Sequence, residues 1–365
     1  MKYSLFAALS MLVVAFNALA AAPLRVAGLF AQSTGKEYIC VTKAFQEIAK
    51  AEGANIKIDV VEHDNSISDL LQKTNSIVAQ KYDIVIGPRT SQEAIATSAI
   101  LTAAKIPQIL PVASYLAPNA ATGRLTVTMV PDSERYSALS AKLIMKRIKP
   151  KNILVIVNES QPYSTNYADL LPKHLKELGY SGKIGQFEYI EGSADYDKIA
   201  AKAKDSKADL IYAPLYGMDI GNLYGALAKA NMRTTLFARA GVFELRDILK
   251  RQYSPAVKLI FNGIWDQKMR GPYAAQFQKL LKDSCKDIEV GVRAVTGFDS
   301  LRLLLDTIKT NPELRGQELA KAIATKSYSG LMGDRKFDMK SGALLLSMPI
   351  FEHNKGGFKI YEVVN

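Results

Sequence analysis

Two stretches decide the fold of this chain: Lys81-Tyr82-Asp83-Ile84-Val85-Ile86-Gly87-Pro88 and Lys207-Ala208-Asp209-Leu210-Ile211-Tyr212-Ala213-Pro214. The second repeats the pattern of the first 126 positions later, and the segments that follow keep their apolar phase without a gap. Identical residues are few, so the repeat is informative mainly about geometry. It predicts two similar α/β lobes, each with loops at the carboxyl ends of its strands, where open α/β sheets bind ligands.

Apolar runs and helix-period segments alternate on both sides of this repeat. We expect strands at 24–30, 56–61, 84–87, 108–112, 153–157, 184–189, 210–213 and 235–238. Between them we expect helices at 44–51, 67–79, 92–104, 168–178, 199–203 and 220–230. This alternation is typical of βαβ units and of a parallel sheet covered on both faces. Later segments read as helices at 273–282, 297–309 and 318–326, then strands at 335–337, 344–351 and 358–363, the last two forming a hairpin.

Length and composition limit the class of protein. The chain has 365 residues, of which 48% are hydrophobic and 22% charged. This length favours two lobes, and this composition excludes a disordered tail, a coiled coil and a collagen-like rod. The two cysteines, Cys40 and Cys285, cannot form a disulfide framework; one bridge and two free thiols are both open. The three histidines, His63, His174 and His353, lack the spacing of a metal-ligand pair, so we expect no metal and no cofactor.

The first twenty residues are typical of a secretory signal peptide. Lys2 precedes an apolar run from Leu5 to Phe16, and Ala18-Leu19-Ala20 supplies small residues before a cleavage point after Ala20. No cysteine stands at that point, so lipid anchoring there is excluded. The run is too short for a spanning helix, although an uncleaved N-terminal anchor is the alternative. We therefore expect an exported, soluble protein.

The formal net charge is +12, which raises the question of a nucleic-acid partner. Export argues against nucleic acid, and the basic residues are scattered. The densest patch is expected to be a solvated helix end, because cations favour helix C-termini; it consists of Lys142, Lys146, Arg147, Lys149 and Lys151.

The repeat also pairs the loops that follow corresponding strands. It places Arg89-Thr90-Ser91 opposite Leu215-Tyr216-Gly217, and Val112-Ala113-Ser114 opposite Ala238-Arg239-Ala240. If the two lobes face each other, these four loops line one cleft.

Several further segments, in their order and spacing, resemble a known family; they are 60–64, 86–88, 106–114, 297–300, 328–333 and 336–338. The mature chain resembles the exported solute-binding proteins of ABC importers, and among them the branched-chain amino acid (Leu/Ile/Val) binding group. The resemblance implies a type I periplasmic-binding-protein fold, with two doubly wound parallel-sheet lobes joined by crossovers near 130–132, 263–265 and 347–350. After the signal peptide at 1–20, lobe 1 would comprise 21–131 plus 266–347, and lobe 2 would comprise 132–265 plus 348–365.

The resemblance also implies a function and a set of partners. The protein would work in the periplasm as a monomer, close around a hinge on a small-molecule ligand, and deliver that ligand to a membrane permease. A ligand-sensing receptor that regulates a signalling partner uses the same fold, and the sequence does not separate the two roles. Neither role involves catalysis.

The family's ligand site can be carried over position by position. Ser91 and Ser114, with the backbone of Val112 and Ala113, stand where the family binds the ligand carboxylate. Ser91 opens a helix, where free N–H groups and the helix dipole favour an anion, although it could equally be only the helix N-cap.

Tyrosines are expected to form the walls of this site. Tyr163 and Tyr216 stand where the family has wall tyrosines in the second lobe, with ordinary surface packing as the alternative. Tyr38 is a further wall candidate, in a front loop that is shorter than usual in the family.

Three residues depart from the family pattern and bear on the ligand's charge. Ala240 replaces the acid that holds the ligand ammonium, while Arg89 and Arg239 occupy opposing loops beside Thr90 and Ala238. Since a guanidinium matches a carboxylate, we expect an anionic ligand such as a carboxylic or dicarboxylic acid. The alternatives are that both arginines point to solvent, and that Glu244 or Asp219 restores a partner for an ammonium group.

Other motifs carry less weight. Ser33-Thr34-Gly35-Lys36 fits the S-x-x-K pattern of penicillin-interacting hydrolases, but the partner motifs and the antiparallel sheet of those enzymes are missing. DNA-binding repressors with similar lobes are excluded by the signal peptide and by the lack of a helix-turn-helix headpiece. Asp299 is expected to have a structural role at the start of a helix.

Overall fold

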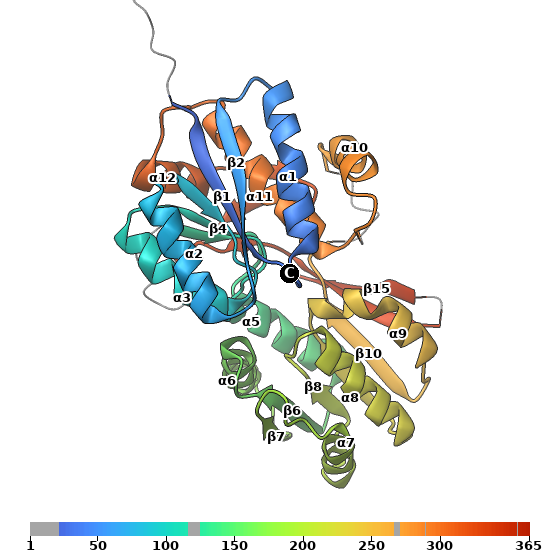
Figure 1. Cartoon of the computed structure of the whole chain (residues 1–365). Helices are drawn as coiled ribbons and strands as arrows, with labels where there is room; N and C mark the ends of the chain where they lie inside the picture. Colours follow the sequence, from blue (N-terminus) through green and yellow to red (C-terminus); the bar gives the residue numbers. More distant parts are fainter. Residues whose placement is uncertain (1–21, 116–124, 266–270, 289, 356) are drawn as a thin grey trace, which may run out of the picture.

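A computed structural model describes residues 22–115, 125–265, 271–288, 290–355 and 357–365. The expected signal peptide at 1–20 lies outside these residues. The chain forms two α/β lobes, drawn one above the other in Figure 1, as the internal repeat predicted.

The upper lobe is built on a five-stranded parallel sheet of order β2-β1-β3-β4-β5. Its strands are β1 (Leu24–Ala31), β2 (Ile56–His63), β3 (Ile84–Ile86), β4 (Gln108–Leu110) and β5 (Thr126–Thr128). Its helices are α1 (Lys36–Ala51), α2 (Ile67–Ala79), α3 (Ser91–Ala103), α10 (Ala274–Ser284), α11 (Val292–Ile308) and α12 (Gly316–Thr325). A small antiparallel sheet joins this lobe late in the chain, from β11 (Tyr328–Gly330), β12 (Gly333–Phe337) and β13 (Leu344–Leu345).

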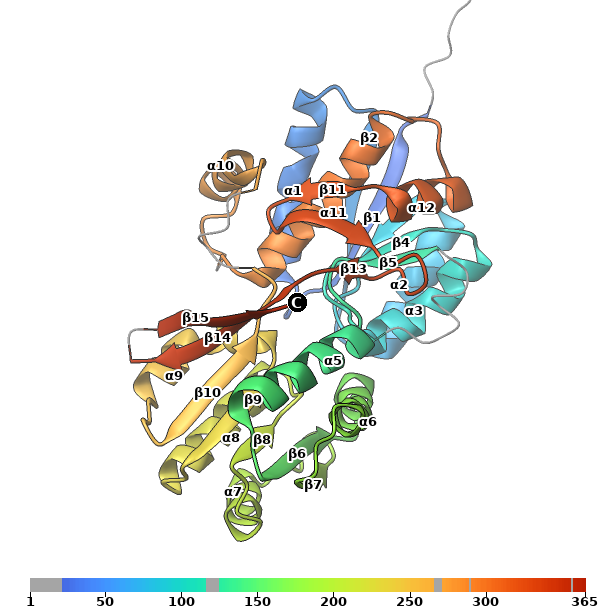
Figure 2. The ribbon, with the colours of Figure 1, turned by 180° about the vertical axis from the view of Figure 1, so that it is seen from behind.

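The lower lobe is built on a seven-stranded sheet of order β15-β14-β10-β9-β8-β6-β7. Its parallel strands are β6 (Asn152–Asn158), β7 (Lys183–Tyr189), β8 (Leu210–Tyr212), β9 (Thr234–Ala238) and β10 (Val257–Asn262). Figure 2 shows the hairpin of β14 (Met348–Asn354) and β15 (Gly357–Val364) at its edge. The helical segments are α5 (Ser133–Leu143), η1 (Ile144–Ile148), α6 (Pro162–Glu177), α7 (Tyr196–Asp205), α8 (Gly217–Lys229), η2 (Ala240–Leu245) and α9 (Arg246–Arg251).

Each sheet is covered on both faces, which is why its strands read as unbroken apolar runs. One hydrophobic cluster runs through both lobes and packs α1 and α11 on the first sheet and α5 and α6 on the second. Separate clusters pack α2 and α3, and α7 and α8, on the opposite faces. The continuous cluster therefore connects the two lobes.

The segment expected as one strand at 344–351 is two strands. β13 pairs with β12 in the upper lobe, whereas β14 pairs with β10 and β15 in the lower lobe. The prediction of one continuous strand is therefore wrong, because the chain passes from one sheet to the other at residues 346–347. The exact lobe boundaries stay a prediction.

Several helices begin earlier than the apolar pattern indicated, because their first turns carry polar or small residues. α1 begins at Lys36 instead of residue 44, and α11 begins at Val292 instead of residue 297. Asp299 therefore lies inside α11 and not at a helix start. Its fully buried carboxylate does have a structural role: it accepts hydrogen bonds from Tyr328 Oη and from the N–H groups of Leu331 and Met332.

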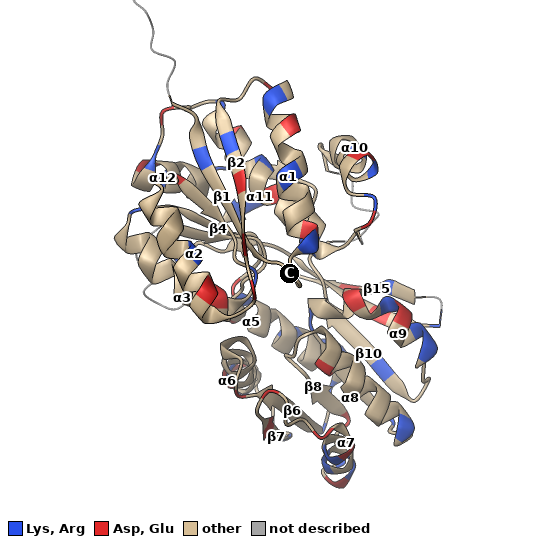
Figure 3. Cartoon of the chain, in the orientation of Figure 1, with Lys and Arg blue, Asp and Glu red and all other residues tan. Residues whose placement is uncertain are grey.

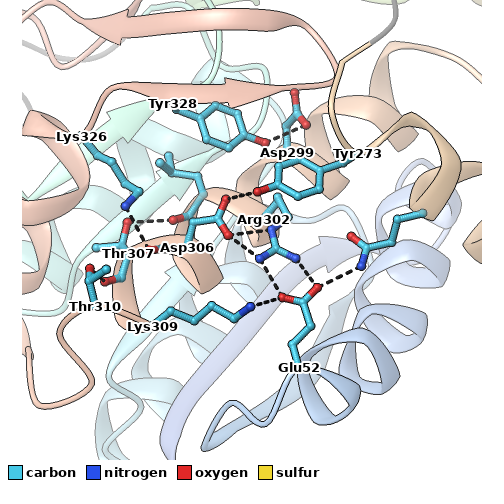
Figure 4. Close-up of polar contacts among 12 residues, drawn as sticks. Glu52, Tyr273, Asp299, Arg302, Asp306, Thr307, Lys309, Thr310, Lys326 and Tyr328 are labelled. Carbon is cyan, nitrogen blue, oxygen red and sulfur yellow. Dashed lines mark hydrogen bonds and ion pairs between the residues drawn. The ribbon is translucent and has the colours of Figure 1, made fainter.

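Two sets of contacts tie α1, α10 and α11 together. Cys40 and Cys285 form a disulfide, which answers the question that the sequence left open. Figure 4 shows the second set, in which Arg302 lies between the carboxylates of Glu52 and Asp306. The side chain of Arg302 is 2% exposed, so its charge depends on these two partners.

Basic and acidic residues are interspersed over both lobes (Figure 3). In the patch at 142–151, Lys146 and Arg147 form ion pairs with Glu362 of β15, beside the end of the α5–η1 helix. Within the described ranges, no helix combines the length and the apolar character needed to cross a bilayer.

Candidate functional site

The first loop of the expected site follows β3 and leads into α3. Gly87 has a φ of +107°, and a Cβ there would lie 2.3 Å from the carbonyl oxygen of Leu29, so this turn requires glycine. The N-cap of α3 is Thr90, whose Oγ1 accepts from the N–H of Glu93 in a capping box. The alternative that Ser91 serves as this N-cap is therefore wrong.

The two serines of the expected site are brought together by neighbouring loops. The N–H of Tyr115 donates to Ser91 Oγ at 3.3 Å, which joins the loop after β4 to the start of α3. Ser91 is 2% exposed and Ser114 is 3% exposed. Of the adjoining residues, Val112 is half-buried, and Ala113 is buried with its carbonyl accepting from Thr128 Oγ1.

Arg239, at the end of β9, is the most unusual residue of the lower lobe, because it is charged and only 4% exposed. Its Nε donates to Tyr163 Oη at 2.9 Å and its Nη2 to Tyr167 Oη at 2.6 Å. Its guanidinium carbon lies 4.2 Å from the ring centroid of Tyr136 and 4.0 Å from that of Tyr167. The alternative that Arg239 points to solvent is wrong.

No carboxylate of the described residues forms an ion pair with Arg239; its immediate partners are tyrosines, and its Nη1 is buried without a hydrogen bond. Cation–π contacts and phenol oxygens stabilise the guanidinium only in part. A buried charge without an opposite charge is costly, so this arrangement favours a negative group nearby.

The guanidinium only donates, so Tyr163 and Tyr167 accept in their bonds with Arg239. Because Arg239 donates to Tyr167, the Tyr167 hydroxyl proton is free to donate onward, and it donates to Ser114 Oγ at 3.1 Å. Burial raises the pKa values of Tyr163 and Tyr167, so both phenols keep their protons.

Three hydroxyl groups of this cluster each accept one hydrogen bond and donate none to a described residue. They belong to Ser91, which accepts from Tyr115, to Ser114, which accepts from Tyr167, and to Tyr163, which accepts from Arg239. The cluster therefore offers several O–H donors to an acceptor that the described residues do not supply.

A stack of rings lies beside these donors. Tyr163 and Tyr216 are stacked with centroids 5.0 Å apart and planes 17° apart. The guanidinium carbon of Arg89 lies 6.0 Å from the Tyr216 ring, and Arg89 itself is half-buried. Arg89 comes from the upper lobe and Tyr216 caps α8 in the lower lobe, so the stack reaches across the lobes.

Several contacts between side chains join the upper and lower lobes. They include the Tyr167–Ser114 hydrogen bond, the Arg89–Tyr216 contact, and an ion pair between Arg293 of α11 and Glu244 of η2.

Both acids considered as partners for an ammonium group already have partners. Asp219 accepts from the hydroxyls of Tyr189, at 2.9 Å, and Tyr196, at 2.6 Å. Glu244 forms the ion pair with Arg293, and Ala240 begins η2 without an ionisable group.

Tyr38 lies in the core of the upper lobe. It is fully buried, stacks on Phe30 with centroids 4.9 Å apart, and has its hydroxyl 3.4 Å from Thr296 Oγ1. Burial raises the pKa of Tyr38 to about 12. Its role as a wall residue stays a prediction. Ser33, the residue of the S-x-x-K pattern, is exposed in a loop and accepts a hydrogen bond from Asn65.

Sequence analysis missed Tyr136 and Tyr167, the two rings that hold Arg239. Tyr167 had a usable signal, because residues four apart share one face of a helix and Tyr163 was already a candidate. Tyr136 had none, since it reaches Arg239 from α5, about a hundred residues earlier in the chain.

Comparisons with known proteins agree with this architecture. A family model described as periplasmic binding protein matches residues 23–357. The Leu/Ile/Val-binding protein of Citrobacter freundii is 24% identical over 221 residues, which cover 60% of this chain and 59% of that protein. The chain spans between 51% and 59% of the length of the first curated relatives that it matches.

Solved structures extend the likeness to nearly the whole chain. A leucine-binding protein from Thermotoga maritima superposes with a TM-score of 0.80 at 18% identity, over 94% of this chain and 99% of that one. A solute-binding protein from R. palustris in complex with 4-hydroxybenzoate superposes with a TM-score of 0.79 at 16% identity, over 94% and 96%. All of these proteins are named as binding proteins. This chain belongs to the periplasmic binding protein family and has the type I fold of its members.

Proposed function

We propose that this protein works in the periplasm, where it captures a small carboxylate-bearing ligand between its two lobes and delivers it to the membrane permease of an ABC importer. The observation that carries the choice of ligand is Arg239, a buried charge without an acidic partner among the described residues, which donates to the hydroxyls of Tyr163 and Tyr167.

The donor set supports a carboxylate. Ser91, Ser114 and Tyr163 each have an O–H group to donate, and a carboxylate is an acceptor with no donor of its own. Ser91 also opens α3, where the free N–H groups and the helix dipole favour an anion. A bound carboxylate would supply the negative charge that Arg239 lacks.

The acids of the site argue against a zwitterionic amino acid. An ammonium group needs a carboxylate or several acceptors, whereas Ala240 offers none, Asp219 is bonded to two tyrosines, and Glu244 is paired with Arg293. The stacked rings of Tyr163 and Tyr216 favour a flat or apolar body attached to the carboxylate. The R. palustris structure shows that this fold can hold a planar acid.

A thermal-shift panel tests the ligand class. Benzoate and 4-methylpentanoate would be compared with their amides, benzamide and 4-methylpentanamide, and with leucine. A ligand at 100 times its Kd adds about 2.7 kcal/mol, which corresponds to a rise in Tm of several degrees. We expect at least one acid to raise Tm, its amide to raise Tm much less, and leucine to leave it unchanged. Stabilisation by leucine but by neither acid would overturn the proposed ligand class.

The Arg239→Met variant tests the residue that carries the proposal. It should greatly reduce the Tm rise given by the acid, while Arg233→Met, which removes an exposed charge from the same lobe, should not. If Arg239→Met does not fold, Tyr163→Phe removes one donor with little change of shape and should weaken binding of the acid. Unchanged affinity in Tyr163→Phe would place that hydroxyl outside the site.

Uptake measurements test delivery. Deleting the gene should abolish energy-dependent import of the stabilising acid by intact cells, and the wild-type gene should restore it. Uptake that persists after the deletion would contradict the proposed role in transport.

A further inference from the structure

One chain of hydrogen bonds in the structure runs from the lower lobe to the upper lobe. It starts at Arg239 Nη2, passes through Tyr167 Oη at 2.6 Å, and reaches Ser114 Oγ at 3.1 Å. All three side chains are at least nine-tenths buried, so little water competes with these bonds. The guanidinium cannot accept, so Arg239 occupies a lone pair of Tyr167 Oη and leaves the phenol proton for Ser114.

The hydrogen bond from Tyr167 determines how the Ser114 hydroxyl can bind a ligand. A free serine hydroxyl can donate or accept, and can therefore bind a carboxylate or a carboxamide with little preference. In this structure Tyr167 donates to Ser114 Oγ, so the serine proton has to point to a different acceptor. Bonds in such a chain polarise one another, which makes the terminal O–H a stronger donor.

We propose that Arg239 and Tyr167 form a positioning relay that sets Ser114 as a donor and thereby makes the site select a carboxylate over a neutral carboxamide of the same shape. The relay rests on the proposed function, because it acts on the carboxylate that Ser114 is proposed to bind. Neither Arg239 nor Tyr167 has to touch the ligand for this effect.

The relay also couples selectivity to closure of the lobes. Tyr167 belongs to α6 of the lower lobe, and Ser114 follows β4 of the upper lobe. Their hydrogen bond exists only when the two lobes meet. An open form would therefore present Ser114 without a fixed direction, and discrimination against the amide arises when the lobes come together.

The Tyr167→Phe variant tests the relay, because it removes one hydroxyl and keeps the ring beside Arg239. The measurement is the ratio of the Kd for the amide to the Kd for the acid, with benzoate and benzamide or 4-methylpentanoate and 4-methylpentanamide as probes. We expect this ratio to fall by roughly five- to tenfold, about the net worth of one hydrogen bond. In an Arg239→Met background the same substitution should have a much smaller effect, because the relay has already lost its origin.

Tyr136→Phe is the matched control, since its ring also lies on Arg239 but its hydroxyl has no place in the relay. It should leave the ratio unchanged. A ratio in Tyr167→Phe equal to that of the wild type, with the acid still bound, would overturn the relay and leave the proposed ligand class standing. An equal fall in Tyr136→Phe would also overturn it, as would additive effects of Tyr167→Phe and Arg239→Met. If neither acid binds the wild type, the proposed ligand class falls, and the relay falls with it.

Discussion

Glu244→Gln should release the ligand faster, because it breaks an ion pair that joins the two lobes. Arg293 of α11 pairs with Glu244 of η2 and, through Nη1, with Glu37 Oε2 of α1 at 3.5 Å. The same Nη1 donates to the carbonyl of Thr34 at 3.1 Å, so the upper lobe holds Arg293 in place. Glu244 reaches that guanidinium only when the lobes are together, and the pair therefore stabilises the closed form alone.

The size of the effect follows from the exposure of the two side chains. Arg293 is 19% exposed and Glu244 is 40% exposed. Fully exposed pairs contribute about 0.2–1 kcal/mol, and a pair in a half-buried network with a preorganised arginine lies near the upper end, at about 1 kcal/mol. That energy corresponds to a dissociation rate roughly fivefold faster in Glu244→Gln.

The assay can use the single tryptophan of the chain. Trp265 follows β10, in the segment predicted to be the second crossover, and is half-buried, so its fluorescence should report closure in a stopped-flow displacement experiment. Salt should speed release from the wild type more than from Glu244→Gln, because 1 M salt shortens the screening length to about 3 Å. Glu134→Gln, which breaks the Lys173–Glu134 pair within one lobe, is the control and should release at the wild-type rate. Equal release rates for Glu244→Gln and the wild type at low salt would refute the reasoning.

Three further predictions concern stability, each checked by urea unfolding. Replacing Cys40 and Cys285 by serine should lower the free energy of unfolding by about 2–5 kcal/mol, because their bridge closes a separation of 245 residues; reductant should then have no further effect. Burial raises the pKa of Asp299 to about 6, so its protonated form contributes fully to stability below pH 4, and this contribution is lost as pH rises through 6. Asp299→Asn should therefore flatten the dependence of the free energy of unfolding on pH in this range. An unchanged dependence would contradict the raised pKa of Asp299. The hydrogen bond with Arg302 lowers the pKa of Glu52 to about 2, although burial acts in the opposite direction. Glu52→Gln should therefore lower the free energy of unfolding by roughly 1–3 kcal/mol at pH 7. This difference from the wild type should vanish as pH falls from 4.5 toward 2.

Local patterns in the sequence were enough for the architecture. The repeat of residues 81–88 at 207–214 predicted two lobes, and both copies form central buried strands, β3 and β8. The prediction of one strand at 344–351 was wrong, because an apolar run does not show where the chain passes from one sheet to another.

Part of the site was also within reach of the sequence. Ser91, Ser114 and Arg239 were candidates because they follow the carboxyl ends of strands, where open α/β sheets bind ligands. The structure joins them through hydrogen bonds of Tyr115 and Tyr167. Sequence reasoning had placed both arginines either on the ligand or in solvent. It did not foresee an arginine that is buried among tyrosines.

The sequence by itself determined the alternation of strands and helices and the positions of the loops between them. Burial of a strand or of one helix face produces a periodic pattern of apolar residues along the chain, and that pattern can be read from neighbouring residues alone. Only the tertiary structure decided which way the hydroxyls of Ser114 and Tyr163 point. That direction depends on Arg239, which comes from a different strand and, for Ser114, acts across the boundary between the lobes. Hydrogen-bond direction is a property of side chains that meet in space, and the spacing of residues along the chain does not encode it.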